Sequence, residues 1–265
     1  MLAAMELNGT SAIVTGGASG LGEATARVLA AAGAHVVVAD LNEAAGKQVA
    51  AAIGGQFAKT NVTDEEAVLA AVAAAEGSGH PLRAAVNCAG IGFASRTVNR
   101  DGSPHDLASF ARVIAVNLTG TFNVLRLAAA AMAKTEPADA DGQRGVIINT
   151  SSVAGIEGQT GQIAYSASKG GIIGMTVPAA RDLSVIGVRV NTICPGVILT
   201  PIYKSIASGG RDADEFLARL AAPVVFPKRL GRADEFGHLV RSLIENDYMN
   251  AEVVRFDGGI RFQPK

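Results

Sequence analysis

The sequence predicts an α/β fold, in which a doubly wound parallel sheet of about seven strands carries helices on both faces. Short β-branched or aliphatic runs alternate with Ala- and Leu-rich stretches of helical period along the whole chain. Most of these runs are continuously apolar, which is typical of parallel strands that are covered on both faces. No repeat or linker divides the 265 residues, so residues 1–265 are expected to form a single domain.

The expected elements follow the chain in order. The strands are residues 11–15, 35–39, 56–59, 84–87, 146–150, 188–193 and 253–256, and helices between them include 22–32, 64–75, 109–134 and 164–185. Segments 96–106 and 135–144 are rich in Asp, Gly, Pro and Asn and predict surface loops. The irregular region 195–227 contains four prolines and is expected to be a substrate lid, the alternative being a plain connection.

Composition and charge argue against several classes of protein. Hydrophobic residues make up 49% of the chain and charged residues 18%, which excludes wholesale disorder. With 23 Lys and Arg against 24 Asp and Glu, there is no electrostatic reason to expect nucleic acid or an anionic membrane as a partner. No uninterrupted apolar run approaches the roughly 20 residues of a membrane span. The two cysteines and four histidines show no metal-ligand spacing, so we expect a cytoplasmic protein without a metal.

A glycine-rich segment, TGGASGLG at 15–22, follows the first strand and opens the first helix. Gly16, Gly20 and Gly22 permit a tight turn, and the helix N-terminus offers N–H groups and a partial positive charge to a pyrophosphate. An ordinary βα turn is the alternative. The strand before the segment and the helix after it favour a dinucleotide site of the Rossmann type.

Asp40 closes the second strand, eighteen residues after Gly22. An acidic residue at this place accepts hydrogen bonds from the ribose hydroxyls of the cofactor and repels a 2′-phosphate. Neither Gly17 nor Leu41, where a basic residue would receive that phosphate, is basic. The sequence therefore predicts NAD rather than NADP.

Tyr165 and Lys169 are four residues apart, on one face of an expected helix. A phenol titrates near pH 10, and Lys169 together with the positive ring of oxidised nicotinamide would favour the phenolate. Tyr165 would then act as a general base towards an alcohol or a general acid towards a carbonyl. Ser152, after the fifth strand, would polarise the same substrate oxygen, unless it and Ser151 merely cap the strand.

The candidates also share a place in the expected fold. Asn61, segment 87–90, Ser152 and segment 194–196 follow the third to sixth strands, and open α/β sheets bind ligands at these carboxyl ends. Cys88 is interpreted as a small residue near NAD rather than a nucleophile.

Together these residues resemble the short-chain dehydrogenase/reductase family over essentially the whole chain. The sequence is similar to one branch of it, the type 2 3-hydroxyacyl-CoA dehydrogenases, related to 17-beta-hydroxysteroid dehydrogenases. The stretches that carry this likeness are 87–91, 116–124, 142–150, 164–171, 226–231 and 257–261. The resemblance implies an NAD-dependent oxidoreductase that interconverts (S)-3-hydroxyacyl-CoA and 3-oxoacyl-CoA in fatty acid metabolism. It also implies a homotetramer built through 109–134, 164–185 and the C-terminal strand.

The resemblance also assigns residues. Ser152, Tyr165 and Lys169 would be catalytic, and Asn117, otherwise an ordinary core amide, would hold a water that links Lys169 to solvent. The cofactor site would comprise Gly16, Ser19, Gly20, Leu21, Gly22, Asp40, Asn61, Val62, Cys88, Gly90, Tyr165, Lys169, Ile198 and Thr200. Ser152, Gln162 and Tyr165 would contact the substrate. The family usually has Asp-Val where this chain has Asn61-Val62, so an altered adenine contact is expected.

Two other functions remain open. One is a dehydrogenase of hydroxysteroids or small secondary alcohols, with a pocket formed by Phe93, Gln162 and 198–203. The other is a non-catalytic NAD-binding scaffold subunit, against which the intact Ser152, Tyr165 and Lys169 set argues. Basic residues that lie in suitable loops for CoA phosphates are Arg96, Arg100, Lys204 and Arg211.

Overall fold

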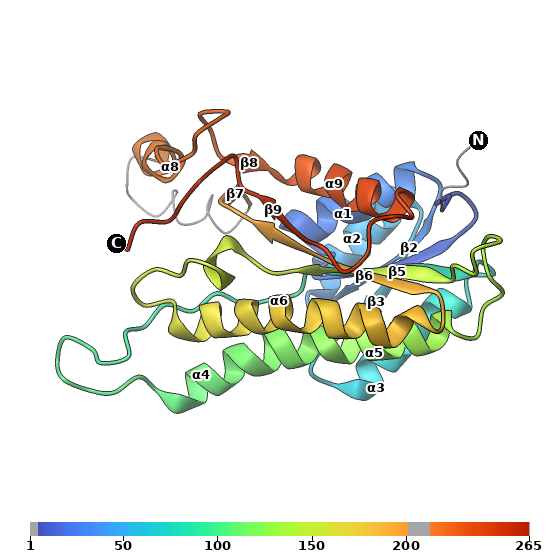
Figure 1. Ribbon diagram of the computed structural model, residues 1–265, viewed down its shortest axis with the longest axis horizontal. Helices are drawn as coiled ribbons and strands as arrows, with labels where there is room; N and C mark the ends of the chain where they lie inside the picture. Colours follow the sequence, from blue (N-terminus) through green and yellow to red (C-terminus); the bar gives the residue numbers. More distant parts are fainter. Residues whose placement is uncertain (1–4, 201–212, 265) are drawn as a thin grey trace.

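The structure is a computed structural model of the chain and describes residues 5–200 and 213–264 (Figure 1). Its centre is a seven-stranded parallel sheet with the order β3-β2-β1-β4-β5-β6-β9. The strands are β1 (Ser11–Thr15), β2 (His35–Asp40), β3 (Gln56–Lys59), β4 (Leu82–Asn87), β5 (Gly145–Thr150), β6 (Val188–Pro195) and β9 (Val253–Phe256). Because the order reverses between β1 and β4, the sheet is doubly wound, which confirms the expected fold.

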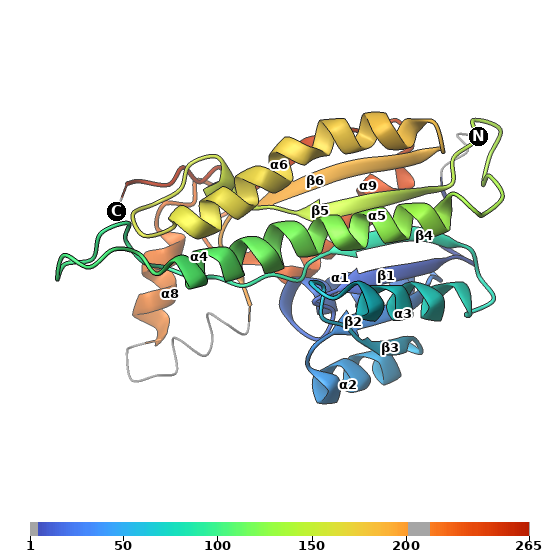
Figure 2. The ribbon, with the colours of Figure 1, turned by 90° about the horizontal axis from the view of Figure 1, so that it is seen from below.

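Helices cover both faces of this sheet (Figures 1 and 2). One face carries α1 (Gly20–Ala31), α2 (Glu43–Ile53) and α9 (Ala233–Glu245). The other carries α3 (Glu65–Glu76), α5 (Gly120–Met132) and α6 (Ile163–Ser184), and α4 (Leu107–Ile114) leads into α5. The β-branched residues of each strand alternate between the two apolar cores, so Val36 and Val38 pack on one side and Val37 on the other.

The expected strands are confirmed to within two residues, and the two expected surface loops are irregular. The expected helix 109–134 is continuous but not α-helical throughout, because a π-helical turn (Ala115–Thr119) joins α4 to α5. The expectation that 195–227 is irregular throughout is wrong. Strand β7 (Ile198–Leu199) pairs with β8 (Gly231–Arg232), and helix α8 (Ala213–Ala221) lies between the prolines, which flank these elements and do not interrupt them.

Residues Leu107–Met132 form one continuous 26-residue helical segment that is long and apolar enough to cross a membrane by length and composition. The sequence pattern did not suggest this, because Arg112, Asn117 and Arg126 interrupt the apolar run. Half of its most apolar window is buried inside the protein, and Val124, Leu125 and other apolar side chains of α5 belong to the core under the sheet. We therefore interpret Leu107–Met132 as a helical segment that packs on the protein core.

Candidate active site

The turn between β1 and α1 is built on glycines that leave no room for a side chain. Gly16 has a φ of +65°, and a Cβ there would lie 2.8 Å from the Ala89 nitrogen. At Gly22 a Cβ would lie 2.1 Å from the Gly16 carbonyl oxygen. Ser19 precedes the helix, and its exposed side chain makes no capping hydrogen bond. The first-turn N–H groups are thus left for an anion, and the turn fits a pyrophosphate.

Asp40 is fixed beside this turn. Its Oδ2 accepts a hydrogen bond from the Ala18 N–H at 3.0 Å, and its Oδ1 accepts one from the Asn42 N–H at 2.8 Å. Each carboxylate oxygen keeps further acceptor capacity for a ribose hydroxyl. Leu41 is exposed and apolar, and Lys59, opposite Asp40 in the sheet, is ion-paired with Glu43 at 3.4 Å. The arrangement fits a cofactor with a free 2′-hydroxyl.

Asn61 lies two residues beyond β3, and its side chain is used locally. Its Oδ1 accepts hydrogen bonds from the backbone N–H and the hydroxyl of Thr63, at 3.1 and 2.9 Å. The amide oxygen expected to meet adenine is therefore already engaged, whereas the exposed Nδ2 is a donor. Val62 follows β3 by three residues, Ile198 begins β7 (Ile198–Leu199), and the half-buried Thr200 follows it. Their contact with the cofactor stays a prediction from the family resemblance.

Cys88 stands directly after β4, where Thr15 Oγ1 accepts hydrogen bonds from the Cys88 and Ala89 N–H groups, each at 3.2 Å. Burial raises the pKa of the Cys88 thiol to about 11. The thiol is neutral at physiological pH, which suits a small residue beside a cofactor and not a nucleophile.

Helix α6 places Lys169 next to Tyr165. The Lys169 Nζ lies 5.7 Å from the centroid of the Tyr165 ring and donates a hydrogen bond of 2.7 Å to the Thr150 carbonyl at the end of β5. Burial lowers the pKa of Lys169 to about 8, because the charged form loses its hydration. At neutral pH the ammonium is still present, so the half-buried phenol of Tyr165 lies beside a poorly solvated positive charge.

The two adjacent serines have different partners. Ser152 is half-buried, precedes a single 3-10 turn (Val153–Gly155), and accepts a hydrogen bond from the Ala154 N–H at 3.1 Å. Because that bond uses an oxygen lone pair, the Ser152 hydroxyl proton is left to donate to a substrate oxygen. Ser151 is buried and donates to the Lys169 carbonyl at 2.7 Å, which ties α6 to the sheet.

Asn117 lies fully buried in the π-helical turn. Its Nδ2 donates to the Ile91 carbonyl at 3.0 Å and to Ser168 Oγ at 3.1 Å, and its Oδ1 accepts from the Ile91 N–H at 2.8 Å. Gly90 lies against it: a Cβ there would be 3.2 Å from Asn117 Oδ1 and 3.6 Å from Lys169 Nζ. Asn117 therefore connects the segment after β4 to α6 beside Lys169, while its role in holding a water stays a prediction.

Comparison with known proteins gives this arrangement a family. The model of the "short chain dehydrogenase" family matches residues 10–210. This chain belongs to the short-chain dehydrogenase family. It is accordingly an oxidoreductase that depends on NAD(H), and the glycine turn and Asp40 fit that cofactor.

Individual members of the family are similar to the chain over their full length. "3-hydroxyacyl-CoA dehydrogenase type-2" of Homo sapiens is 51% identical over 99% of both chains. The protein of the same name from Drosophila melanogaster is 47% identical over 95% of this chain and 97% of its own. A crystal structure of 3-hydroxyacyl-CoA dehydrogenase type-2 from Mycobacterium avium has a TM-score of 0.91 at 52% identity, over 97% of this chain and 98% of the other.

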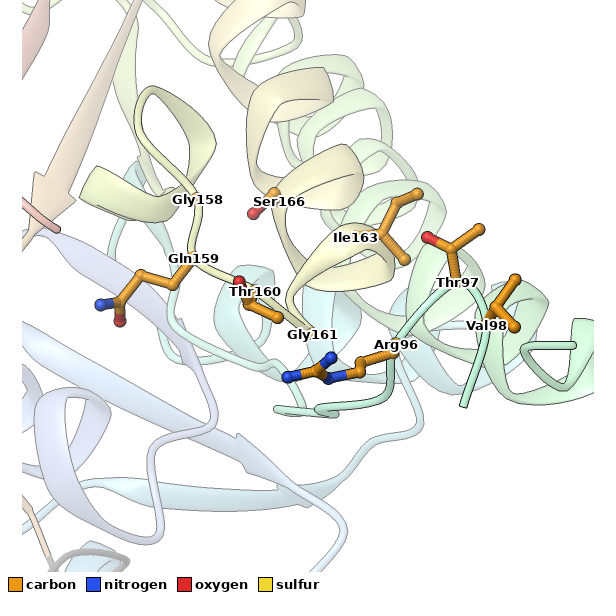
Figure 3. A pocket seen from close by; sticks show the side chains of 9 residues that line it. All are labelled: Arg96, Thr97, Val98, Gly158, Gln159, Thr160, Gly161, Ile163 and Ser166. Carbon is orange, nitrogen blue, oxygen red and sulfur yellow. The ribbon is translucent and has the colours of Figure 1, made fainter. Parts of the chain in front are cut away.

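An open pocket of about 670 Å³ adjoins the start of α6 in this short-chain dehydrogenase (Figure 3). Ile163 and Ser166 flank the position of Tyr165 on the helix. Figure 3 shows Ile163 on the side of Thr97, in the segment after β4, whereas the Ser166 side chain points towards Gly158. The pocket is lined by Arg96, Thr97, Val98, Gly158, Gln159, Thr160, Gly161, Ile163 and Ser166. It lies beside Ser152, Tyr165 and Lys169, the candidate catalytic residues, and its lining does not include them.

Several of these lining residues were not singled out by the sequence, because small and aliphatic residues carry no chemical signal. Gln162, expected to contact substrate, is not among them; its Oε1 accepts a hydrogen bond from the Gln159 N–H at 2.9 Å and so supports the loop. Arg96 lines the pocket, whereas Lys204, Arg211 and residues 201–203 lie outside the described residues. Among the described residues, no group of three or more His, Cys, Asp or Glu side chains could hold a metal ion.

Proposed function

We propose that this dehydrogenase interconverts (S)-3-hydroxyacyl-CoA and 3-oxoacyl-CoA with NAD. The observation that carries the proposal is the full-length likeness to the relatives named 3-hydroxyacyl-CoA dehydrogenase type-2. The complete set of Ser152, Tyr165 and Lys169 at the carboxyl end of β5 supports a working enzyme over a scaffold. The names of these relatives favour an acyl-CoA over a hydroxysteroid as the main substrate.

The chemistry divides between the cofactor and the protein. NAD held at the glycine turn and Asp40 would supply the acceptor for the hydride of the carbinol carbon. Tyr165, as phenolate, takes the proton of the substrate hydroxyl, and in the reverse direction its hydroxyl returns that proton. Ser152 donates a hydrogen bond to the same oxygen, which steadies the charge that develops on it.

Lys169 prepares Tyr165 for this task. Its ammonium, held by the Thr150 carbonyl 2.7 Å away, is positioned next to the phenol ring and favours the phenolate. Its pKa, lowered to about 8, means that the ammonium is present at neutral pH and is lost as the pH rises above about 8. The oxidation should therefore have an optimum set by two opposing changes: Tyr165 must lose a proton while Lys169 keeps one.

The pocket beside α6 would hold the part of the substrate beyond the reacting carbon. Arg96 gives this pocket a guanidinium, a group well suited to phosphate. Described parts of the expected lid, β7 and α8, lie at the same end of the sheet (Figure 1), and we propose that region 195–227 covers bound substrate.

Two further properties belong to this proposal. Exposed apolar side chains on α4, α5 and α6, namely Leu107, Phe122 and Val177, support a homotetramer formed through these helices. Both cysteines, Cys88 and Cys194, are free, which supports the reducing cytoplasm as the location. Sedimentation of the purified protein tests the first of these, since a monomer would contradict it.

The decisive assay is NADH oxidation by the purified protein with acetoacetyl-CoA, with NADPH as the parallel control. Rapid turnover with NADH and little with NADPH is expected. A steroid ketone and a small ketone should give a much lower kcat/KM than acetoacetyl-CoA. Absence of turnover with acetoacetyl-CoA, despite tight NADH binding, would overturn the acyl-CoA assignment and leave the dehydrogenase fold unaffected.

A further inference from the structure

The C-terminal segment 260–264 lies along the loop that precedes α6. The Phe262 N–H donates to Glu157 Oε1 at 3.2 Å, and Gln159 Nε2 donates to the Gln263 carbonyl at 2.9 Å. The Pro264 carbonyl accepts both the N–H of Thr160 at 3.2 Å and its hydroxyl at 2.9 Å. Both ribbon views show the C-terminus at the end of the molecule where α6 begins (Figures 1 and 2).

The segment is anchored to the sheet before it reaches this loop. Arg255, in β9, is ion-paired with Asp257 at 2.6 Å and with Glu157 at 2.8 Å, and its guanidinium donates to the Ile260 carbonyl at 3.0 Å. The Ile260 side chain is fully buried. The chain beyond Ile260 therefore leaves a fixed point and can hold the loop in place.

The loop in turn connects to the catalytic helix and the pocket. Gln159 donates its N–H to the Gln162 side chain, and the Gln162 carbonyl accepts the Ser166 N–H at 2.7 Å in the first turn of α6, which carries Tyr165. Residues 158–161 form one wall of the pocket. The loop also contacts the segment after β4, because the Ser95 N–H donates to the Gly161 carbonyl at 2.9 Å.

We propose that segment 260–264 is a positioning element that holds loop 157–162, and through it the pocket wall and the first turn of α6, in the geometry that the substrate needs. The inference rests on the proposed function for its kinetic consequence. Phe262, Gln263 and Pro264 form their hydrogen bonds to the loop through main-chain groups, so the proposal assigns this role to the main chain of residues 262–264. Glu157 is the side chain that receives both the tail and Arg255.

Truncation after Arg261 tests the proposal. Loss of these hydrogen bonds should lower kcat/KM for acetoacetyl-CoA about tenfold, mainly through KM. NADH affinity should change less than twofold, because the tail does not contact the glycine turn. The full-length variant Gln263→Ala, which keeps the main chain and changes an exposed side chain, is the matched control and should retain its kcat/KM. Equal losses in the truncated protein and this control would overturn the proposal, as would full activity of the truncated protein.

Glu157 gives a second, independent variant. Glu157→Ala should reproduce the rise in KM, whereas Glu157→Gln, which keeps an acceptor for the Phe262 N–H and for Arg255, should restore most of the affinity for substrate. Glu76→Ala, at an exposed glutamate on α3, is the control. A Glu157→Gln variant as impaired as Glu157→Ala would contradict a role in accepting these hydrogen bonds.

Hydrogen exchange separates this inference from the proposed function, because it needs no substrate. The amides of Thr160 and Ser166 should exchange at least about fivefold faster in the truncated protein, while amides of β1 and α1 keep their rates. Faster exchange with no turnover of acetoacetyl-CoA by the wild type would support the positioning element and reject the acyl-CoA assignment. Unchanged exchange at Thr160 would reject the positioning element.

Discussion

Two of the buried cations, Arg189 and Lys169, lie at opposite ends of the sheet, and they are held in different ways. Arg189, near the amino end of β6, donates to the Gln143 side chain at 2.6 Å and to the carbonyls of Leu243, Ile244 and Met249 at 2.7 to 2.9 Å. The Asp247 carboxylate lies 3.6 Å from the guanidinium. Lys169, near the carboxyl end of β5, donates to the Thr150 carbonyl, and burial lowers its pKa to about 8.

The difference indicates that the cation at the amino end of the sheet contributes to stability, whereas the cation at the carboxyl end contributes to chemistry. The guanidinium of Arg189 has an acceptor for each nitrogen, so its charge is used in joining β6, α9 and the loop after α5. The charge of Lys169 is poorly solvated and lies beside Tyr165, so it is available to stabilise a phenolate. A buried charge that its surroundings satisfy holds elements together, while one that they satisfy only in part can shift the pKa of its neighbour.

The largest expected effect belongs to Tyr165→Phe, which removes the proton-transferring hydroxyl and keeps the ring beside Lys169. Turnover of acetoacetyl-CoA should fall about 10³-fold, while NADH binding, measured by fluorescence, stays within twofold. Normal turnover by this variant would show that the charge of Lys169 does not act through Tyr165. The functional contrast between Lys169 and Arg189 would then be wrong.

Replacing each cation by methionine separates the two roles directly. Arg189→Met leaves several buried acceptors unpaired and should lower the free energy of unfolding by about 3–5 kcal/mol. Lys169→Met removes a desolvated charge as well as one hydrogen bond, so its unfolding free energy should change by about 1 kcal/mol or less at pH 7, with turnover about 10²-fold lower. Denaturant unfolding and steady-state kinetics of both variants check this, and equal destabilisation would contradict it.

The pH dependence of stability sharpens the same comparison. Between the folded pKa of Lys169, about 8, and its ordinary value of 10.5, the unfolded chain binds a proton that the folded protein has lost. Stability arising from Lys169 must therefore rise with pH across this window. Cys88 and other groups titrate in a neighbouring pH range. The quantity to measure is therefore the difference in unfolding free energy between wild type and Lys169→Met. That difference should grow in favour of the wild type from pH 8 to 10, and a flat difference would contradict the lowered pKa.

Ser152 and Ser151 are adjacent, and they show the same contrast between a residue expected to act on the substrate and one expected to stabilise the fold. Ser152→Ala removes a donor to the substrate oxygen and should lower kcat about 10²-fold with little change in stability. Ser151→Ala removes the buried hydrogen bond to the Lys169 carbonyl and should lower the free energy of unfolding by about 1–2 kcal/mol with kcat changed less than about fivefold. Exchanged outcomes would mean that the assignment of the two serines is reversed.

The sequence predicted those parts of the molecule whose function depends on side-chain type. The glycine turn, Asp40 and Ser152 could be placed together, because parallel strands bring their carboxyl ends to one edge. Tyr165 and Lys169 were singled out by their spacing of four residues on one helical face. Contacts made through the main chain gave no such signal: the Thr150 carbonyl that holds Lys169 and the Pro264 carbonyl that holds Thr160 are independent of residue type.

Two local structures were also beyond prediction. The π-helical turn around Asn117 coincides with side-chain hydrogen bonds from Asn117 to Ile91 and Ser168, partners that lie far from it in the sequence. Helix α8 was not predicted, because the prolines on either side of it led to an interpretation of region 195–227 as irregular. In both cases contacts between distant segments, or residues outside the element, decide the local structure.

The smallest expected effect concerns Asp40, whose carboxylate is shared between the protein and the cofactor. Asp40→Ala removes the repulsion of a 2′-phosphate but also the acceptor of the Ala18 and Asn42 N–H groups. The ratio of kcat/KM for NADH to that for NADPH should fall about tenfold, mainly through weaker use of NADH. Asp40→Asn, which keeps an acceptor without the charge, is the matched control and separates repulsion from support of the turn. If it improves use of NADPH as much as Asp40→Ala does, charge sets the preference; if it leaves the ratio unchanged, Asp40 acts by holding the glycine turn in place.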